Sequence, residues 1–173
     1  MKKLVFAALL LSFAAFSAAA QTPCKEHSEP QGVFTICQPD GWAPQPSSPD
    51  RKYRSLRRAK SPTAQISFIE RTDAASVYDV GFRGIANVFA AKDELEISNV
   101  RVISAGDFMT ASGEKGIRFL FALTSEGVDS RKLSFIFQAA GNTKLQINAT
   151  STAADTAFES EVDAAVKTLK IRK

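Results

Sequence analysis

Four strand-like segments separated by short glycine-bearing loops dominate the second half of the chain. The segments are Val100 to Thr110, Gly116 to Ser125, Arg131 to Ala139 and Lys144 to Ser151, and the loops between them are ASGEKG, SEGVDS and AGNT. Loops of this length cannot hold a crossover helix, so consecutive segments must pair as antiparallel hairpins. The pattern predicts a four-stranded meander and excludes a doubly wound parallel fold.

The two middle segments of the meander are apolar on both faces. Phe119 to Phe121 are consecutive apolar residues in one segment, and Phe135 to Phe137 are consecutive in the next. A strand with two apolar faces is usually covered on both sides. We therefore expect these strands at the centre of the sheet, with helices on both of its faces.

Three shorter strands and a helix are predicted before the meander, and a second helix after it. The strands are Val33 to Gln38, Lys52 to Arg58 and Gln65 to Arg71. Apolar residues recur at helical spacing from Ala75 to Ala91 and from Ala154 to Leu169, and Thr152 and Asp155 have the spacing of a capping box. The order β-β-β-α-β-β-β-β-α predicts an α+β domain, an antiparallel sheet of six to seven strands with helices packed on it.

The first twenty residues have the parts of a secretory signal peptide. Two lysines near the start precede an apolar run from Leu4 to Phe16, which is followed by Ser17-Ala18-Ala19-Ala20. The run is shorter than the roughly 20 residues that span a bilayer. We predict that residues 1–20 are cleaved and that residues 21–173 form a single exported domain without a transmembrane segment. The periplasm is the predicted location, with the extracellular space as the alternative.

The charge of the mature chain is close to balanced. The full sequence has 22 Lys and Arg against 18 Asp and Glu, and cleavage after Ala20 removes two lysines and no acid, which leaves a net charge of +2. This balance does not favour nucleic acid as a partner, and neither does an exported location.

Both cysteines and the single histidine lie near the start of the mature chain. Cys24, His27 and Cys37 would supply three metal ligands, but a structural zinc site needs four, and the sequence has no other Cys or His. Two cysteines in an exported chain usually pair, and closing a loop of about 14 residues stabilises a fold by about 3 kcal/mol. We predict a Cys24–Cys37 disulfide, an exposed and inert His27, and neither a metal nor a cofactor.

The segment RKYRSLRRAK has the strongest local charge bias in the chain. Its basic residues are Arg51, Lys52, Arg54, Arg57, Arg58 and Lys60. One interpretation is a patch that binds an anionic surface, such as lipid headgroups, acidic polysaccharide or an acidic protein. The other is a charged strand that keeps a sheet edge from pairing with another chain, and the low net charge favours this second interpretation.

Several motifs together resemble the Mog1/PsbP-like family, which includes bacterial periplasmic PsbP-like and DcrB-like proteins. They are F-x-I-C-x-P-x-G-W near the start, ASGEKGIRFLFAL, the Phe-rich KLSFIFQAAGNTKLQINAT and the closing FESEVDAAVKTLKI. The resemblance covers most of residues 33–171. It implies an α/β/α sandwich that acts as a non-enzymatic module: PsbP assists photosystem II, and Mog1 binds a nuclear-transport GTPase. No functional residue of either protein is matched here.

The sequence thus predicts a non-enzymatic, exported accessory or interaction module whose partner is an unknown protein or envelope component. No catalytic set is predicted, since the paired acids Glu159 and Asp163 lie on the polar face of a helix. The alternative is a carrier for a lipid or other apolar ligand in a cleft between sheet and helix. Ten phenylalanines of the mature chain would either line such a cavity or fill the core.

Overall fold

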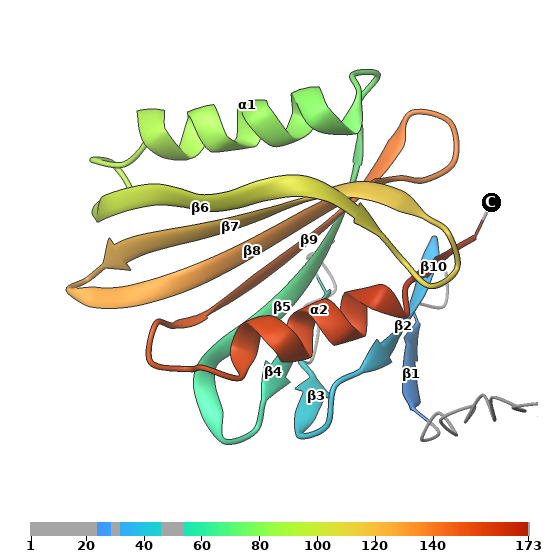
Figure 1. Ribbon diagram of the computed structural model, residues 1–173, viewed down its shortest axis with the longest axis horizontal. Coiled ribbons are helices and arrows are strands. Elements are labelled where there is room, and N and C mark those ends of the chain that lie inside the picture. Colours follow the sequence, from blue (N-terminus) through green and yellow to red (C-terminus); the bar gives the residue numbers. More distant parts are fainter. Residues whose placement is uncertain (1–23, 29–31, 46–53, 173) are drawn as a thin grey trace, which may run out of the picture.

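The computed structural model describes residues 24–28, 32–45 and 54–172 (Figure 1). The predicted signal peptide and the basic residues Arg51 and Lys52 lie outside the described residues. The strands are β1 (Lys25–Ser28), β2 (Phe34–Gln38), β3 (Trp42–Pro44), β4 (Arg54–Arg58), β5 (Ser61–Thr72), β6 (Ile97–Met109), β7 (Lys115–Ser125), β8 (Val128–Gln138), β9 (Thr143–Thr152) and β10 (Lys170–Ile171). The helices are α1 (Val77–Ala90) and α2 (Phe158–Lys167).

Seven antiparallel strands form the main sheet, in the order β3-β4-β5-β9-β8-β7-β6. The four strands after α1 are joined in sequence order, as the hairpin loops predict: β6 pairs with β7, β7 with β8, and β8 with β9. The first half of the chain joins the meander where β5 pairs with β9. The predicted fold class, α+β with an antiparallel sheet of six to seven strands, is confirmed.

A second sheet has three strands, in the order β1-β2-β10. The sequence predicted β2, but it did not predict β1, β3 or β10, which have four, three and two residues. Strands this short cannot show an alternating pattern, so they depend on the partners that hold them. In the described residues five strands therefore precede α1 instead of three, and one strand follows α2.

The two helices cover opposite faces of the main sheet, as Figure 1 shows. Because side chains alternate along a strand, the apolar residues of β7 and β8 are divided between two cores. The smaller core, under α1, contains Val80, Ile117, Phe119, Phe121 and Ile136. The larger core, under α2, includes Leu120, Leu133, Phe135, Phe137, Phe158 and Val162. The prediction that these two strands are covered on both sides is confirmed.

The start of α1 follows the local sequence. The side chain of Ser76 accepts a hydrogen bond from the backbone N–H of Asp79, at 3.1 Å, which caps the helix. No helix in the described part of the chain is both long enough and apolar enough to cross a membrane.

The start of α2 differs from its prediction. The expected capping box at Thr152 and Asp155 is wrong, because α2 begins at Phe158 and its N-cap residue, Ala157, makes no side-chain hydrogen bond. The carboxylate of Asp155 instead binds Arg58 of β4 at 2.6 Å. A charged partner distant in the sequence thus determines the role of Asp155.

Candidate functional site

Cys24 and Cys37 form the predicted disulfide, with an S–S distance of 2.03 Å. It joins the residue before β1 to β2, and so it fixes the beginning of the described chain to the three-stranded sheet. The pairing removes the two thiolates that a metal site would need. In residues 24–28, 32–45 and 54–172, no three His, Cys, Asp or Glu side chains lie close enough together to hold a metal ion.

His27 is half-buried, so the prediction that it is exposed is wrong. Its ring lies 5.4 Å from that of Phe68 and 6.5 Å from that of Phe34, centroid to centroid. Strand β1, which the sequence did not predict, places it there by pairing His27 with Ile36 of β2. The histidine therefore has a packing role.

The basic stretch does not form one continuous surface. Arg57 and Lys60 are exposed, whereas Arg58 reaches α2 and its side chain is 15% exposed. For Arg54 the structure describes only the backbone. Strand β4 is also not an edge, because β3 pairs with its outer side. The edge-protecting interpretation therefore does not apply to β4, and anion binding by Arg57 and Lys60 stays a prediction.

Arg58 is the centre of a half-buried charged cluster between β3, β4 and α2. Its Nη1 donates to Asp155 Oδ2 and its Nη2 to Glu161 Oε2, each at 2.6 Å, and Glu161 Oε2 also accepts from Trp42 Nε1 at 3.0 Å. Burial acts to raise the pKa of Asp155, but hydrogen bonds from Arg58 and Ser151 outweigh it and hold that pKa below its ordinary value. The cluster attaches α2 to the sheet, so Arg58 already has anionic partners within the chain.

The sequence allowed an apolar ligand in a cleft between the sheet and a helix, and one such cleft lies under α1. Its lining includes Gly84, Ile85 and Phe121, with Lys132 and Gln146 on the polar side, and its volume is about 50 Å³. Small-molecule pockets hold roughly 300–1,000 Å³. Burial lowers the pKa of Lys132 in this confined space. The cleft has room for water but not for an acyl chain.

Most phenylalanines of the described chain fill the core. Those exposed by 6% or less are Phe34, Phe68, Phe119, Phe121, Phe135, Phe137 and Phe158. Of the two interpretations that the sequence left open for these aromatic residues, the structure supports core packing.

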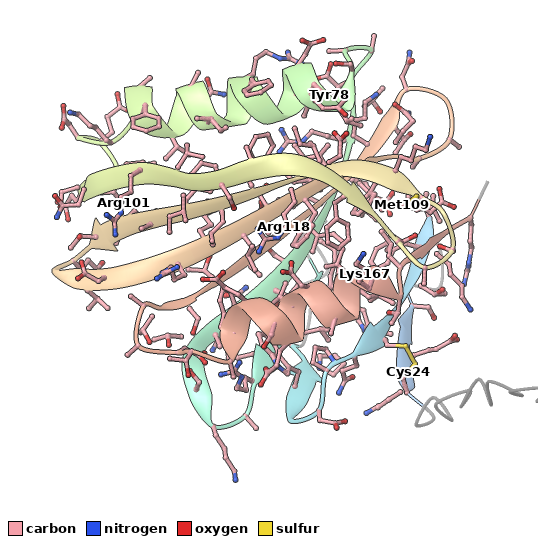
Figure 2. All side chains as sticks on the ribbon, viewed as in Figure 1. Cys24, Tyr78, Arg101, Met109, Arg118 and Lys167 are labelled. Atoms are coloured by element: carbon pink, nitrogen blue, oxygen red, sulfur yellow. A yellow bond between two sulfur atoms is a disulfide. The ribbon has the colours of Figure 1, made fainter. Side chains whose placement is uncertain are left out.

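Exposed apolar side chains are concentrated on one edge of the molecule. In the described residues eight large apolar side chains are exposed, and seven of them lie on α1, on β6 or in the turn between. We call this set the α1–β6 edge: Tyr78, Phe82, Phe89, Leu95, Val102, Ile103 and Met109. Figure 2 shows α1 and β6 running alongside each other, with Tyr78 and Met109 toward one end and Arg101 toward the other.

Strand β6 is the outer strand of the main sheet beside these side chains. It pairs with β7 on one side, and no described strand pairs with the other side. It has 13 residues, against three in β3 at the opposite edge. Its sequence has neither lysine nor proline, which commonly protect edge strands. The pairing with β7 shifts register before Ser104 and is regular from Ser104 to Met109. The Met109 carbonyl accepts a hydrogen bond from Lys167 Nζ at 3.1 Å, so the stretch open to a further strand is Ser104 to Phe108.

One side of α1 faces this edge strand. The hydroxyl of Tyr78 donates a hydrogen bond to the carboxylate of Asp107 on β6. Phe82 and Phe89 follow Tyr78 by four and eleven residues, which places them on the same side of the helix. On β6, Val102 lies opposite Phe121 of β7, whose side chain is in the core under α1, so Val102 projects on the α1 side as well. The exposed apolar side chains of α1 and β6 therefore lie next to each other, beside the side of β6 that no described strand pairs with.

The sequence predicts the strand from Val100 to Thr110, which corresponds to β6, but not its position at the edge of the sheet. That position follows from the pairing of β5 with β9, which places β9 inside the sheet and leaves β6 outside. The usable signal was the run from Val100 to Gly106, where Val102 and Ile103 are adjacent. Adjacent residues in a strand project from opposite faces, so α1 cannot cover both of them.

Solved structures with this arrangement come from proteins of distant sequence. Cyanobacterial PsbP (CyanoP) from Synechocystis sp. PCC 6803 matches with a TM-score of 0.64 and 13% identity, over 92% of this chain and 98% of that chain. The Saccharomyces cerevisiae Ran-binding protein Mog1p matches with a TM-score of 0.60 and 9% identity, over 86% of this chain and 95% of that chain. The chain has the Mog1/PsbP-like fold.

The same Mog1/PsbP-like arrangement is found in LpqN of Mycobacterium tuberculosis, a protein involved in cell envelope biogenesis. The TM-score is 0.57 at 15% identity, over 89% of this chain and 88% of that chain. This chain spans 50% of the length of a Bacteroides thetaiotaomicron chain that it also matches. No protein-family model and no curated protein sequence matches it. At such identities the likeness establishes the fold, and the function must be argued from the surfaces of this chain.

Proposed function

We propose that this protein is a non-enzymatic, exported interaction module that binds a partner protein along the α1–β6 edge. The observation that carries the proposal is the location of seven of the eight exposed large apolar side chains on that edge. Contiguous apolar surface is rarely left in water by a soluble protein, because its burial is favourable. Such a surface is typical of a binding site.

The backbone of β6 offers the second part of the binding surface. In an antiparallel edge strand, alternate N–H and C=O groups point away from the sheet and stay unpaired. An extended segment of a partner that pairs with Ser104 to Phe108 would satisfy these groups and extend the sheet. Its apolar side chains would contact Val102 and Phe82, which removes their exposed surface from water.

A cell-envelope setting is part of the proposal. Residues 1–20 act as a cleaved signal peptide, residues 21–173 form the exported domain, and the partner is a protein of the same compartment. The Cys24–Cys37 disulfide supports export, because disulfides persist in oxidising compartments. Among proteins of this fold, LpqN is involved in cell envelope biogenesis and Mog1p is a Ran-binding protein. Both descriptions are compatible with a binding module.

The test places a positive charge on the edge strand. Ile103→Lys alters β6, and Val128→Lys is the matched control because the two side chains are 43% and 49% exposed. Each variant carries a photo-crosslinking amino acid in place of Met109 and is crosslinked in the exporting host. We expect the control to keep its crosslinked partner and Ile103→Lys to lose at least nine-tenths of it, about a tenfold effect, because an ammonium group is costly to bury in an apolar interface.

Two results would contradict this proposal. Equal crosslinking yields from two folded variants would show that the partner does not bind at β6. A crosslinked homodimer, seen also as a dimer by analytical ultracentrifugation, would identify the occupant of the edge as a second copy of the chain. Circular dichroism spectra of both variants establish that they are folded.

The alternative functions have less support from the structure. A carrier of a lipid or another apolar ligand could not use the cleft under α1, which provides about 50 Å³. An enzyme would need a set of reactive side chains held together. In the described chain the single histidine packs on Phe68, and both cysteines are in the disulfide.

A further inference from the structure

A row of three residues crosses β6, β7 and β8 on the sheet face that carries α2. Arg101 of β6 lies opposite Ala122 of β7, and Ala122 lies opposite Arg131 of β8. Residues opposite each other on neighbouring strands project from the same face. Two strand spacings place the α-carbons of the two arginines about 10 Å apart. Only the methyl group of Ala122 lies between the two long cationic side chains.

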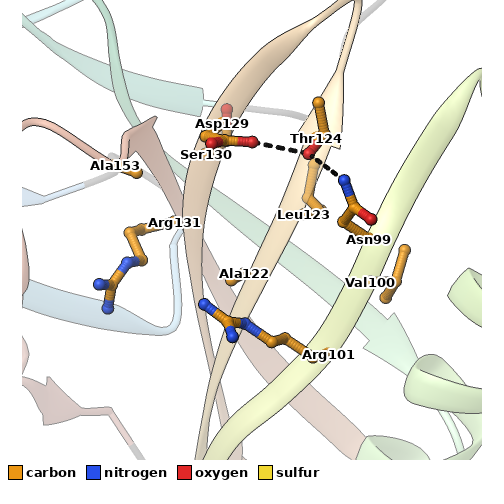
Figure 3. Close-up of a pocket in the computed structure, with 10 residues that line it drawn as sticks. All are labelled: Asn99, Val100, Arg101, Ala122, Leu123, Thr124, Asp129, Ser130, Arg131 and Ala153. Atoms are coloured by element: carbon orange, nitrogen blue, oxygen red, sulfur yellow. Dashed lines mark hydrogen bonds between the residues drawn. The ribbon is translucent and has the colours of Figure 1, made fainter.

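A cleft of about 550 Å³ lies over this row (Figure 3), and its size is within the range of small-molecule pockets. Figure 3 shows the side chains of Arg101 and Arg131 on either side of Ala122. A hydrogen-bonded chain closes one end: Asn99 Nδ2 donates to Thr124 Oγ1 at 3.1 Å, and Thr124 Oγ1 donates to Asp129 Oδ1 at 2.7 Å. The one carboxylate in the lining is therefore bound to a hydroxyl group.

In the described chain, one of the two arginines of the cleft has a carboxylate partner. Arg131 Nη1 donates to Glu159 Oε1 at 2.8 Å, and the neighbouring Arg118 donates from Nε and Nη2 to Asp163 at 2.8 and 3.0 Å. Arg101 makes no ion pair within the described part of the chain. An anion bound between the two side chains would give Arg101 a charged partner and would attract Arg131 in addition to its existing pairing with Glu159.

We propose that this cleft binds an oxyanion, the carboxylate or phosphate group of a small ligand or a lipid headgroup, between Arg101 and Arg131. A guanidinium group can donate two parallel N–H bonds to either oxyanion, and such charge-assisted bonds are stronger than neutral ones. The site faces α2, whereas the apolar side chains Phe82 and Val102 lie on the α1 side. Oxyanion binding is therefore separate from the partner binding proposed for the α1–β6 edge.

The first experiment titrates inorganic phosphate into ¹⁵N-labelled protein at constant ionic strength and follows the amide of Ala122 and the arginine Nε–H signals by NMR. We expect saturable shifts centred on the Arg101–Ala122–Arg131 row and an affinity at least tenfold lower in Arg101→Gln. Arg71→Gln is the matched control, because it removes the same charge from an exposed position on β5, outside the predicted basic patch. Its phosphate affinity should equal that of the unaltered protein.

A second arm distinguishes the two sources of the oxyanion. It replaces phosphate with vesicles of phosphatidylglycerol or of neutral phosphatidylcholine. Binding to phosphatidylglycerol alone, lost in Arg101→Gln, identifies a lipid headgroup. Phosphate binding without vesicle binding identifies a soluble ligand. Either result supports the site.

A further variant tests the site without removing an arginine, in case an arginine variant unfolds. Ala122→Glu places a carboxylate between the two arginines, so it should fold and lose phosphate binding. The proposal is overturned if the unaltered protein shows no saturable shift, or if Arg101→Gln or Ala122→Glu binds phosphate as tightly as the unaltered protein. It is equally overturned if Arg71→Gln loses as much affinity as Arg101→Gln, since binding then reflects overall charge.

Discussion

Asp155 accepts hydrogen bonds from Arg58 and Ser151, and its pKa lies below its ordinary value for that reason, although burial acts to raise it. A carboxyl with a lower pKa in the folded state stabilises the protein above its unfolded pKa, which is about 3.9. This contribution disappears as the pH falls through the folded pKa. We expect the free energy of unfolding to decrease below about pH 4, and Asp155→Asn to show a shallower decrease.

The same variant tests the cluster at neutral pH. Asp155→Asn should lower the free energy of unfolding by about 1–3 kcal/mol, because a half-buried guanidinium group loses one carboxylate partner. Denaturant unfolding followed through the buried Trp42 measures both effects. Asp93→Asn, in the exposed turn after α1, is the control and should change stability by less than about 0.5 kcal/mol. Equal pH dependence in Asp155→Asn and the unaltered protein would refute this role.

The role of Arg58 depends on contacts with residues that are far away in the sequence. The sequence places it in a run of basic residues, which indicates a charged surface. Its partners Asp155 and Glu161 follow by 97 and 103 positions, and only the folded chain brings them together. The disulfide was predictable because the chain has only two cysteines, which leaves one intramolecular pairing.

At the scale of elements, α1 holds two glycines with opposite roles. A Cβ atom at Gly81 would lie 2.5 Å from Phe119 Cε2, whereas one at Gly84 would meet nothing within 4 Å. Gly81→Ala should cost about 1–3 kcal/mol, because Phe119 is fully packed and must shift. Gly84→Ala should gain up to about 1 kcal/mol from helix propensity. Thermal unfolding of both variants measures the difference, and equal shifts in Tm would contradict the close packing of α1 at Gly81.

Some elements are determined by their own residues, whereas others depend on partners far away in the sequence. The hairpins of β6 to β9 are determined by their own residues, through alternating side chains and glycine-bearing loops. Strand β10 exists only because Lys170 and Ile171 pair with Thr35 and Phe34, far away in sequence. The candidate binding edge belongs to this second kind. Its strand was predicted, but its place at the edge depends on the pairing of β5 with β9.

At the scale of the whole molecule, both ends of the described chain meet at one strand. β1 and β10 pair with opposite sides of β2, and the disulfide lies at this junction. Without the Cys24–Cys37 bond, β1 would be held by a four-residue pairing and by the packing of His27 on Phe68. The bond therefore retains the first strand, and its formation depends on the compartment in which the chain folds.

Export and disulfide formation are tested together. Intact mass spectrometry of the protein from its exporting host should show a chain that begins at Gln21 and lacks two hydrogens, because cleavage follows Ala20 and the thiols are oxidised. The double variant Cys24→Ser/Cys37→Ser should unfold with a free energy lower by about 3 kcal/mol, because closing a loop of this length restricts the unfolded chain. The proposed export is refuted if the purified protein retains residues 1–20. The proposed disulfide is refuted if a thiol reagent modifies both cysteines without prior reduction. An unchanged unfolding midpoint in the double variant would instead show that β2 holds β1 without the bond.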